Sequence, residues 1–178
     1  MRPPAKISSE ETLYTAALGA LARRAHSVFE MRSYLERRAA DREAARHVLA
    51  RLRQEKLLDD ARYALDFARH RARARRQGRY RITRELRVRG VPDQHIEAAV
   101  AQAFAETDEA LLVRKVIERR LQTLRGPFDE RRAASLYRSL LRGGFDSELI
   151  RRELRTATRG DAAERPEGRE ALVREECD

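Results

Sequence analysis

Apolar residues recur at three- and four-residue intervals along almost the whole chain, which is the spacing of amphipathic helices. Leu13, Ala17 and Leu21 mark a first helix, and Val48 and Leu52 lie on the apolar face of a third. Strand signals are nearly absent, because β-branched clusters are few and no Asn-Gly or Asp-Gly turn joins alternating segments. The pattern therefore predicts an all-α protein.

Polar residues mark where several of these helices begin. Ser27, followed three residues later by Glu30, has the spacing of a capping box. Asp59 is placed to cap a long helix that runs through Tyr63 and Phe67. We expect these two rings, four residues apart on one helix face, to point into the core.

Three segments align without gaps at offsets of 51 and 54 residues; they start at Leu35, Leu86 and Leu140. Gly90 and Gly144 fit the residue just after a helix, where the chain needs a positive φ. We predict an elongated array of three tandem three-helix repeats. The expected segments are a disordered N-terminal segment (1–10), repeat one (11–57), a basic repeat two (58–106), repeat three (107–157) and a disordered acidic tail (158–178).

The charge of the chain is strongly basic and unevenly distributed. Lys and Arg number 39 against 29 Asp and Glu, a net charge of +10, and all but three of the basic residues are arginine. Residues 69–89 hold ten arginines and a single acid, Glu85. A charge concentration of this kind attracts a polyanion or an acidic protein surface. Cys177 is the only cysteine, which excludes an intramolecular disulfide and suits a reducing cytoplasm.

No residue pattern indicates an enzyme. The adjacent carboxylates Asp59 and Asp60 could serve acid–base or metal chemistry only with a third converging partner, so we interpret them as helix-capping residues. The four histidines have no metal-ligand spacing, and the glycines form no phosphate-binding loop. We therefore expect no catalytic residue, no metal and no cofactor.

The arginines have a helical arrangement of their own. Arg62, Arg69, Arg73 and Arg76 follow helical steps on one predicted face, and a second flank of arginines follows on the next helix. A solvated face would usually mix signs, so we favour a binding surface that contacts phosphates or acidic side chains. The predicted contact residues are Arg69, Arg73, Arg76, Arg79, Arg81 and Arg84.

A helix–glycine turn–helix pattern at residues 80–104 offers a helix-turn-helix alternative, but its second helix opens with few base-reading side chains. The arginines lie on the preceding elements instead, which suits phosphate or acidic-surface contact. Tyr80, inside the basic stretch, either stacks on a base or covers a seam between helices.

Four motifs together resemble the RecX regulatory proteins over residues 12–155: Arg24–Met31 with Leu35, Leu58–Ala64, Gly78–Val91, and Arg142–Phe145 with Ile150. The resemblance implies three tandem three-helix repeats. It also implies binding to the RecA recombinase and its DNA filament, with inhibition of filament growth, ATP hydrolysis, strand exchange and the SOS response. The family is not itself an ATPase.

The expected protein is thus a cytoplasmic, monomeric regulator with a RecA filament as partner, open to direct contact with single-stranded DNA, and without a membrane partner. Two alternatives stay open. One is a general nucleic-acid-binding helical module that acts without a recombinase, and the other is a structural scaffold with affinity for neither.

Overall fold

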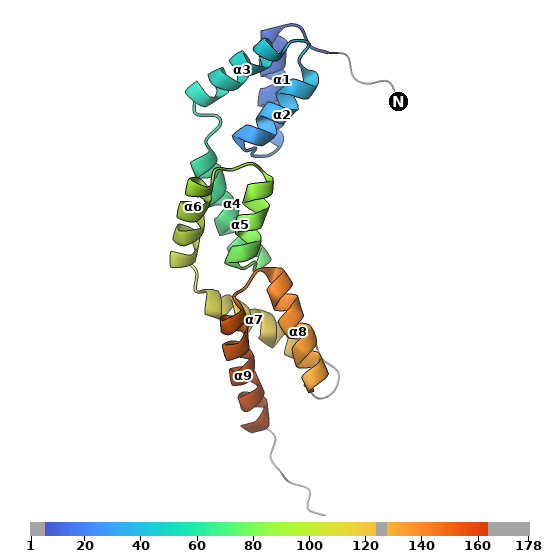
Figure 1. The fold of residues 1–178 in the computed structure, drawn as a ribbon, viewed down its shortest axis with the longest axis vertical. Coiled ribbons are helices and arrows are strands. Elements are labelled where there is room, and N and C mark those ends of the chain that lie inside the picture. The colour runs from blue at the N-terminus through green and yellow to red at the C-terminus, as the bar shows by residue number, and fades with distance from the viewer. Residues whose placement is uncertain (1–5, 124–127, 164–178) are drawn as a thin grey trace, which may run out of the picture.

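The computed structural model describes residues 6–123 and 128–163 of the chain. These residues form nine helices and no strand, which confirms the predicted all-α class. Figure 1 shows three groups of three helices arranged along one long axis, so the predicted elongated array is confirmed as well. The helices are α1 (Glu10–Arg23), α2 (Val28–Arg38), α3 (Arg42–Gln54), α4 (Asp60–Arg75), α5 (Arg79–Val88), α6 (Asp93–Ala105), α7 (Glu109–Gln122), α8 (Glu130–Gly143) and α9 (Ser147–Ala163).

Two apolar cores hold the array together. The first belongs to α1–α3 and contains the fully buried Leu13, Leu35 and Leu52. The second runs without a break from Ala64 in α4 to Leu154 in α9, so repeats two and three share one core. Repeat one is therefore attached to the rest mainly by other contacts. In the described segments, no helix is both long and apolar enough to cross a lipid bilayer.

The buried face of α4 consists of alanines and not of aromatic rings. Ala64, Ala68 and Ala72 are fully buried, and α6 packs directly against this helix. Tyr63 and Phe67 are only partly buried and stack on each other at the edge of the core, with ring centroids 6.1 Å apart. The rings therefore face the core as expected, but they pack at its edge, because the small alanine side chains let α4 and α6 approach closely.

The predicted helix starts and turns are present. Ser27 and Glu30 form both hydrogen bonds of the capping box, and the Asp59 carboxylate accepts from the first backbone N–H groups of α4. Gly90 and Gly144 have φ values of 68° and 87°, in the left-handed region that favours glycine. Both turns therefore end their helices as the repeat alignment predicts.

The second helices of successive repeats dock end to end, and α5 lies between α2 and α8 in Figure 1. At the junction of repeats two and three, the Gly78 N–H donates to the Gly143 carbonyl at 2.9 Å, and the Tyr80 N–H donates to the Gly144 carbonyl at 3.1 Å. These bonds satisfy backbone groups that helix ends leave unpaired. A Cβ on Gly78 would lie 2.3 Å from the Gly144 oxygen, so the contact requires glycine.

The junction between repeats one and two has the same arrangement, but here side chains form the hydrogen bonds. The Ser27 hydroxyl donates to the Arg89 carbonyl at 2.6 Å, and the Val28 N–H donates to the Asp60 carboxylate at 2.9 Å. Phe29 covers the turn, where a Cβ on Gly90 would lie 2.4 Å from its ring. The start of α2 therefore sits on the end of α5 as the start of α5 sits on the end of α8.

Of the segments expected to be disordered, 1–10 and 158–178, the structure describes only residues 6–10 and 158–163. Ile7 pairs with Ala39 in an isolated bridge, because the Ile7 N–H donates to Arg38 and the Ile7 carbonyl accepts from Ala40, each at 2.8 Å. Helix α9 continues to Ala163. Residues 1–5 and the acidic residues 164–178 lie outside the described residues.

The glycine junction can be tested by adding one methyl group. We expect Gly144→Ala to lower the free energy of unfolding by about 2–4 kcal/mol, because the residue has φ 87° and its Cβ would lie 2.3 Å from the Arg81 nitrogen. Gly19→Ala in α1 is the control: its methyl meets only the tip of Arg23, and alanine should stabilise the helix by about 0.5–1 kcal/mol. Chemical denaturation measures both, and a tolerated Gly144→Ala would contradict the junction.

Candidate basic interface

The six predicted contact arginines lie at the end of α4 and on α5: Arg69, Arg73, Arg76, Arg79, Arg81 and Arg84. Arg76 does not extend the face of α4. The helix ends at Arg75, and Arg76 has a left-handed φ of 50° that turns the chain toward Gly78 and the end of α8. The predicted common face is therefore wrong for Arg76, which belongs to the junction instead.

A glutamate from the end of α6 neutralises part of the α4 cluster. Arg69 forms an ion pair with Glu106, its Nε donating to Oε2 at 3.0 Å, and Arg73 donates to the same oxygen at 2.9 Å. The hydrogen bond from Arg69 and the charges of both arginines hold the pKa of Glu106 below its usual value. Two guanidinium groups thus share one carboxylate.

Two further carboxylates serve the arginines of α5. Arg79 donates to Glu109, in the first turn of α7, at 2.8 Å. Arg81 and Arg71 both pair with Glu85, at 3.0 and 3.3 Å. Burial alone would raise the pKa of Glu85, but the hydrogen bond from Arg81 and the charge of Arg71 outweigh it and lower that pKa.

The expectation that Glu85 alone offsets the arginines of residues 69–89 is therefore wrong. Glu106 and Glu109 come from beyond the basic stretch and pair with Arg69, Arg73 and Arg79, while Asp93 pairs with Arg87. Ten arginines of residues 69–89 consequently face four carboxylates, so the region keeps a clear positive excess. In the described part of the chain, Arg76 and Arg84 are the two predicted contact residues without an ion pair.

Repeats two and three together form a basic groove. It consists of two adjoining hollows of about 450 and 530 Å³, which share Val116, Arg119, Ser139 and Arg142. No Asp or Glu lines either hollow among the described residues. Five exposed arginines of the groove have no ion pair within those residues: Arg75, Arg76, Arg119, Arg120 and Arg142.

The sequence did not identify Arg119, Arg120 and Arg142 as part of the site. Their local stretches contain acids such as Glu118 and Glu130, so no run of like charge stands out. The one available signal was the glycine turn after Arg142, since a turn that docks on α5 brings Arg142 to repeat two. Charge counted along the chain cannot reveal a groove that tertiary packing assembles.

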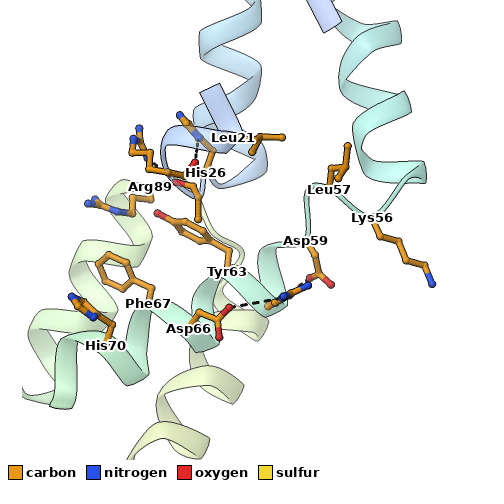
Figure 2. Close-up of a pocket in the computed structure, with 13 residues that line it drawn as sticks. Leu21, His26, Lys56, Leu57, Asp59, Tyr63, Asp66, Phe67, His70 and Arg89 are labelled. Carbon is orange, nitrogen blue, oxygen red and sulfur yellow. Dashed lines mark hydrogen bonds and ion pairs between the residues drawn. The ribbon is translucent and has the colours of Figure 1, made fainter. Parts of the chain in front are cut away.

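A second hollow, of about 580 Å³, lies between repeats one and two and has mixed charge. Figure 2 shows Tyr63, Phe67 and Asp66 of α4 on one side of it and His26 and Leu21 of repeat one on the other. Burial lowers the pKa of His26. Because Asp59 and Asp66 also line this hollow, it does not have the one-sided charge that a polyanion needs.

The acidic pair at the start of α4 is occupied by backbone groups. Asp59 caps α4 itself, and Asp60 accepts the Val28 N–H of the neighbouring repeat. In residues 6–123 and 128–163, no group of three or more His, Cys, Asp or Glu side chains is arranged to hold a metal ion. Tyr80 is 66% exposed, so it does not cover a seam between helices.

Residues 14–52 match the family description "RecX, first three-helix domain", and residues 59–100 match "RecX, second three-helix domain". A "Regulatory protein RecX" of Halorhodospira halophila is 38% identical over 86% of this chain and 93% of its own length. One of Prosthecochloris aestuarii is 37% identical over 78% and 88%. The crystal structure of RecX from Lactobacillus salivarius has the same fold, with a TM-score of 0.71, 18% identity and coverage of 84% of this chain and 96% of that one.

The shared carboxylate of the α4 cluster gives a charge test. Glu106→Gln frees two guanidinium groups, so we expect the dissociation constant for heparin, used as a generic polyanion, to fall about threefold. Glu36→Gln in α2 removes the same charge from an exposed glutamate of repeat one whose side chain has no ion pair with a described residue. Heparin binding in a salt series compares the two variants, and equal gains would mean that net charge alone matters.

Proposed function

Because this chain belongs to the RecX family of regulatory proteins, we propose that it binds the RecA recombinase on its DNA filament and inhibits recombinase activity. The affected activities are filament growth, ATP hydrolysis and strand exchange, so the protein acts in the regulation of DNA repair, recombination and the SOS response. It works as a monomer in the cytoplasm, beside its partner, and it regulates without catalysing a reaction itself.

The elongated shape supports this proposal mechanically. Three repeats docked end to end present one long surface, whereas a compact domain of the same size would reach a single protomer of a filament. An array of this length is suited to bridge neighbouring protomers and to hold them in a fixed relation. Such a bridge would oppose the changes that accompany ATP hydrolysis.

The observation that carries the proposal is the excess of arginine over carboxylate in repeat two. Arg76 and Arg84 are exposed and form no ion pair with the described residues, so their guanidinium groups are available to a partner. The other four proposed contacts, Arg69, Arg73, Arg79 and Arg81, keep partial exposure beside their carboxylates. Exposed ion pairs contribute at most about 1 kcal/mol, so a phosphate or an acidic side chain can replace the internal partner.

A general nucleic-acid-binding module that acts without a recombinase is the second candidate, and the carboxylate-free groove favours it. The two candidates differ in stoichiometry. A regulator that locks a filament lowers RecA-stimulated ATP hydrolysis at substoichiometric ratios. A module that merely competes for DNA inhibits only when the DNA is saturated.

An ATPase titration of RecA on single-stranded DNA tests the proposal at the two unpaired contacts. We expect Arg76→Glu with Arg84→Glu to raise the concentration for half-inhibition at least tenfold, because two attractive charges become repulsive. Arg37→Glu with Arg46→Glu makes the same charge change at exposed positions of repeat one that lack an ion pair with any described residue. This control pair should inhibit nearly as well as the parent chain.

Circular dichroism should show the same helicity in both double variants. The proposal fails if the parent chain inhibits only at DNA saturation. The residue assignment fails if the repeat-one variant loses as much inhibition as the repeat-two variant.

A further inference from the structure

We propose that the basic groove between repeats two and three binds the phosphate backbone of a single-stranded nucleic acid directly. The groove is the set Arg75, Arg76, Arg119, Arg120 and Arg142 with the two hollows that they line. This inference goes beyond the recombinase proposal, because it assigns a nucleic-acid site to residues of repeat three and needs no recombinase to be present.

Three helix ends converge on this groove. Arg75 and Arg76 come from the end of α4, Arg119 and Arg120 from the last turns of α7, and Arg142 from the last turn of α8. A cation at a helix C-terminus stabilises that helix, which would explain one arginine at each end. This stabilisation does not explain why three helix ends meet at the same two hollows, or why no carboxylate of the described residues lines these hollows.

The magnitudes favour an external anion. Each helix end contributes a partial negative charge of about half a unit, so three ends offset only part of five guanidinium charges. Elsewhere in this chain, arginines that hold the fold together have a carboxylate partner: Arg24 has Glu30, Arg51 has Glu11 and Glu55, and Arg114 has Glu153. The groove arginines have no such partner, and arginine binds phosphate in a bidentate manner.

Gln77 adds an observation that arginines alone do not give. Its side chain is 8% exposed and lines the same hollow as Arg75, Arg76 and Arg142. The Gln77 Nε2 donates to Glu85, but the buried Oε1 has no hydrogen-bond partner among the described residues. The Oε1 atom is covered by the protein, so the side chain must move to accept from a ligand; nucleobases carry N–H donors for such an acceptor, whereas ionised phosphates do not.

The groove's hollow of about 530 Å³ is lined by groups that suit the bases and phosphates of a strand. Phe128 offers a partly buried ring on which a base can stack, and the hydroxyls of Ser135 and Ser139 can donate to phosphate oxygens. The combination of arginines with an adjacent aromatic face is the usual composition of single-strand binding sites. A site for an acidic peptide needs the arginines but not the aromatic face.

The recessed shape selects a single strand over a duplex. Hollows of about 450 and 530 Å³ are of the size that takes individual small groups, and a flexible strand can bend into them. Duplex DNA is stiff over about 50 nm and presents a convex surface, so it cannot follow a groove of this shape without deformation.

Fluorescence anisotropy with a labelled thymidine oligonucleotide, in the absence of recombinase, tests the inference. We expect Arg119→Gln with Arg142→Gln to weaken binding about tenfold at low salt and to reduce the slope of log K against log salt by about 1.4, or 0.7 per lost contact. Arg46→Gln with Arg53→Gln removes the same charge from exposed arginines of repeat one that have no ion pair in the described chain. It should change affinity by less than about twofold.

A duplex of the same length should bind more weakly than the single strand. Equal losses in the two double variants, or no loss in the groove variant, would overturn the inference. The inference would also be overturned if the groove substitutions weakened the binding of polyglutamate and left oligonucleotide binding unchanged. The groove would then be a site for an acidic protein segment. Because Arg119 and Arg142 are not among the recombinase contacts, the groove variant can fail here and still inhibit RecA.

Discussion

The contact on which the structure depends is the end-to-end docking of α5 on α8. Backbone N–H groups at the start of one helix bond directly to carbonyls at the end of the other, and glycines at 78 and 144 remove the side-chain atoms that would keep them apart. This contact satisfies groups that would otherwise be buried without partners. It also fixes the α4–α5 turn beside the last turns of α7 and α8, and so completes the groove, whose hollow of about 450 Å³ is lined by both repeats.

The same contact explains why the repeats are not equivalent. Repeat one has Ala39 with φ −65° where the other repeats have a glycine, and none of the nine described helices docks on that end of α2. Ile7 bonds there instead, and the first core stays separate from the second. Repeats two and three are joined by backbone contacts and a continuous core, whereas repeat one is attached through Ser27, Val28 and Asp60. Repeats two and three thus form one firmly joined pair, and repeat one is attached to this pair mainly by polar contacts.

Local features could be predicted from the sequence, and long-range charge pairing could not. The capping box at Ser27, the cap at Asp59 and the turns at Gly90 and Gly144 depend on neighbouring residues, and the structure contains all of them. Glu106 pairs with Arg69 from 37 residues away, so no window along the chain could have counted it. The groove arginines of repeat three were missed for the same reason. Arginine in this chain therefore serves two purposes, holding helices together where a carboxylate is near and forming an electropositive surface where none is.

Amide hydrogen exchange at the α5–α8 junction tests the central claim most directly. If the helix ends dock as described, the Gly78 and Tyr80 amides exchange nearly as slowly as the amides of Ile82 and Leu86, which lie in the core of the same repeat. If the repeats are only loosely tethered, these two amides exchange as fast as those in the exposed first turn of α1, and the groove would not exist as a formed site.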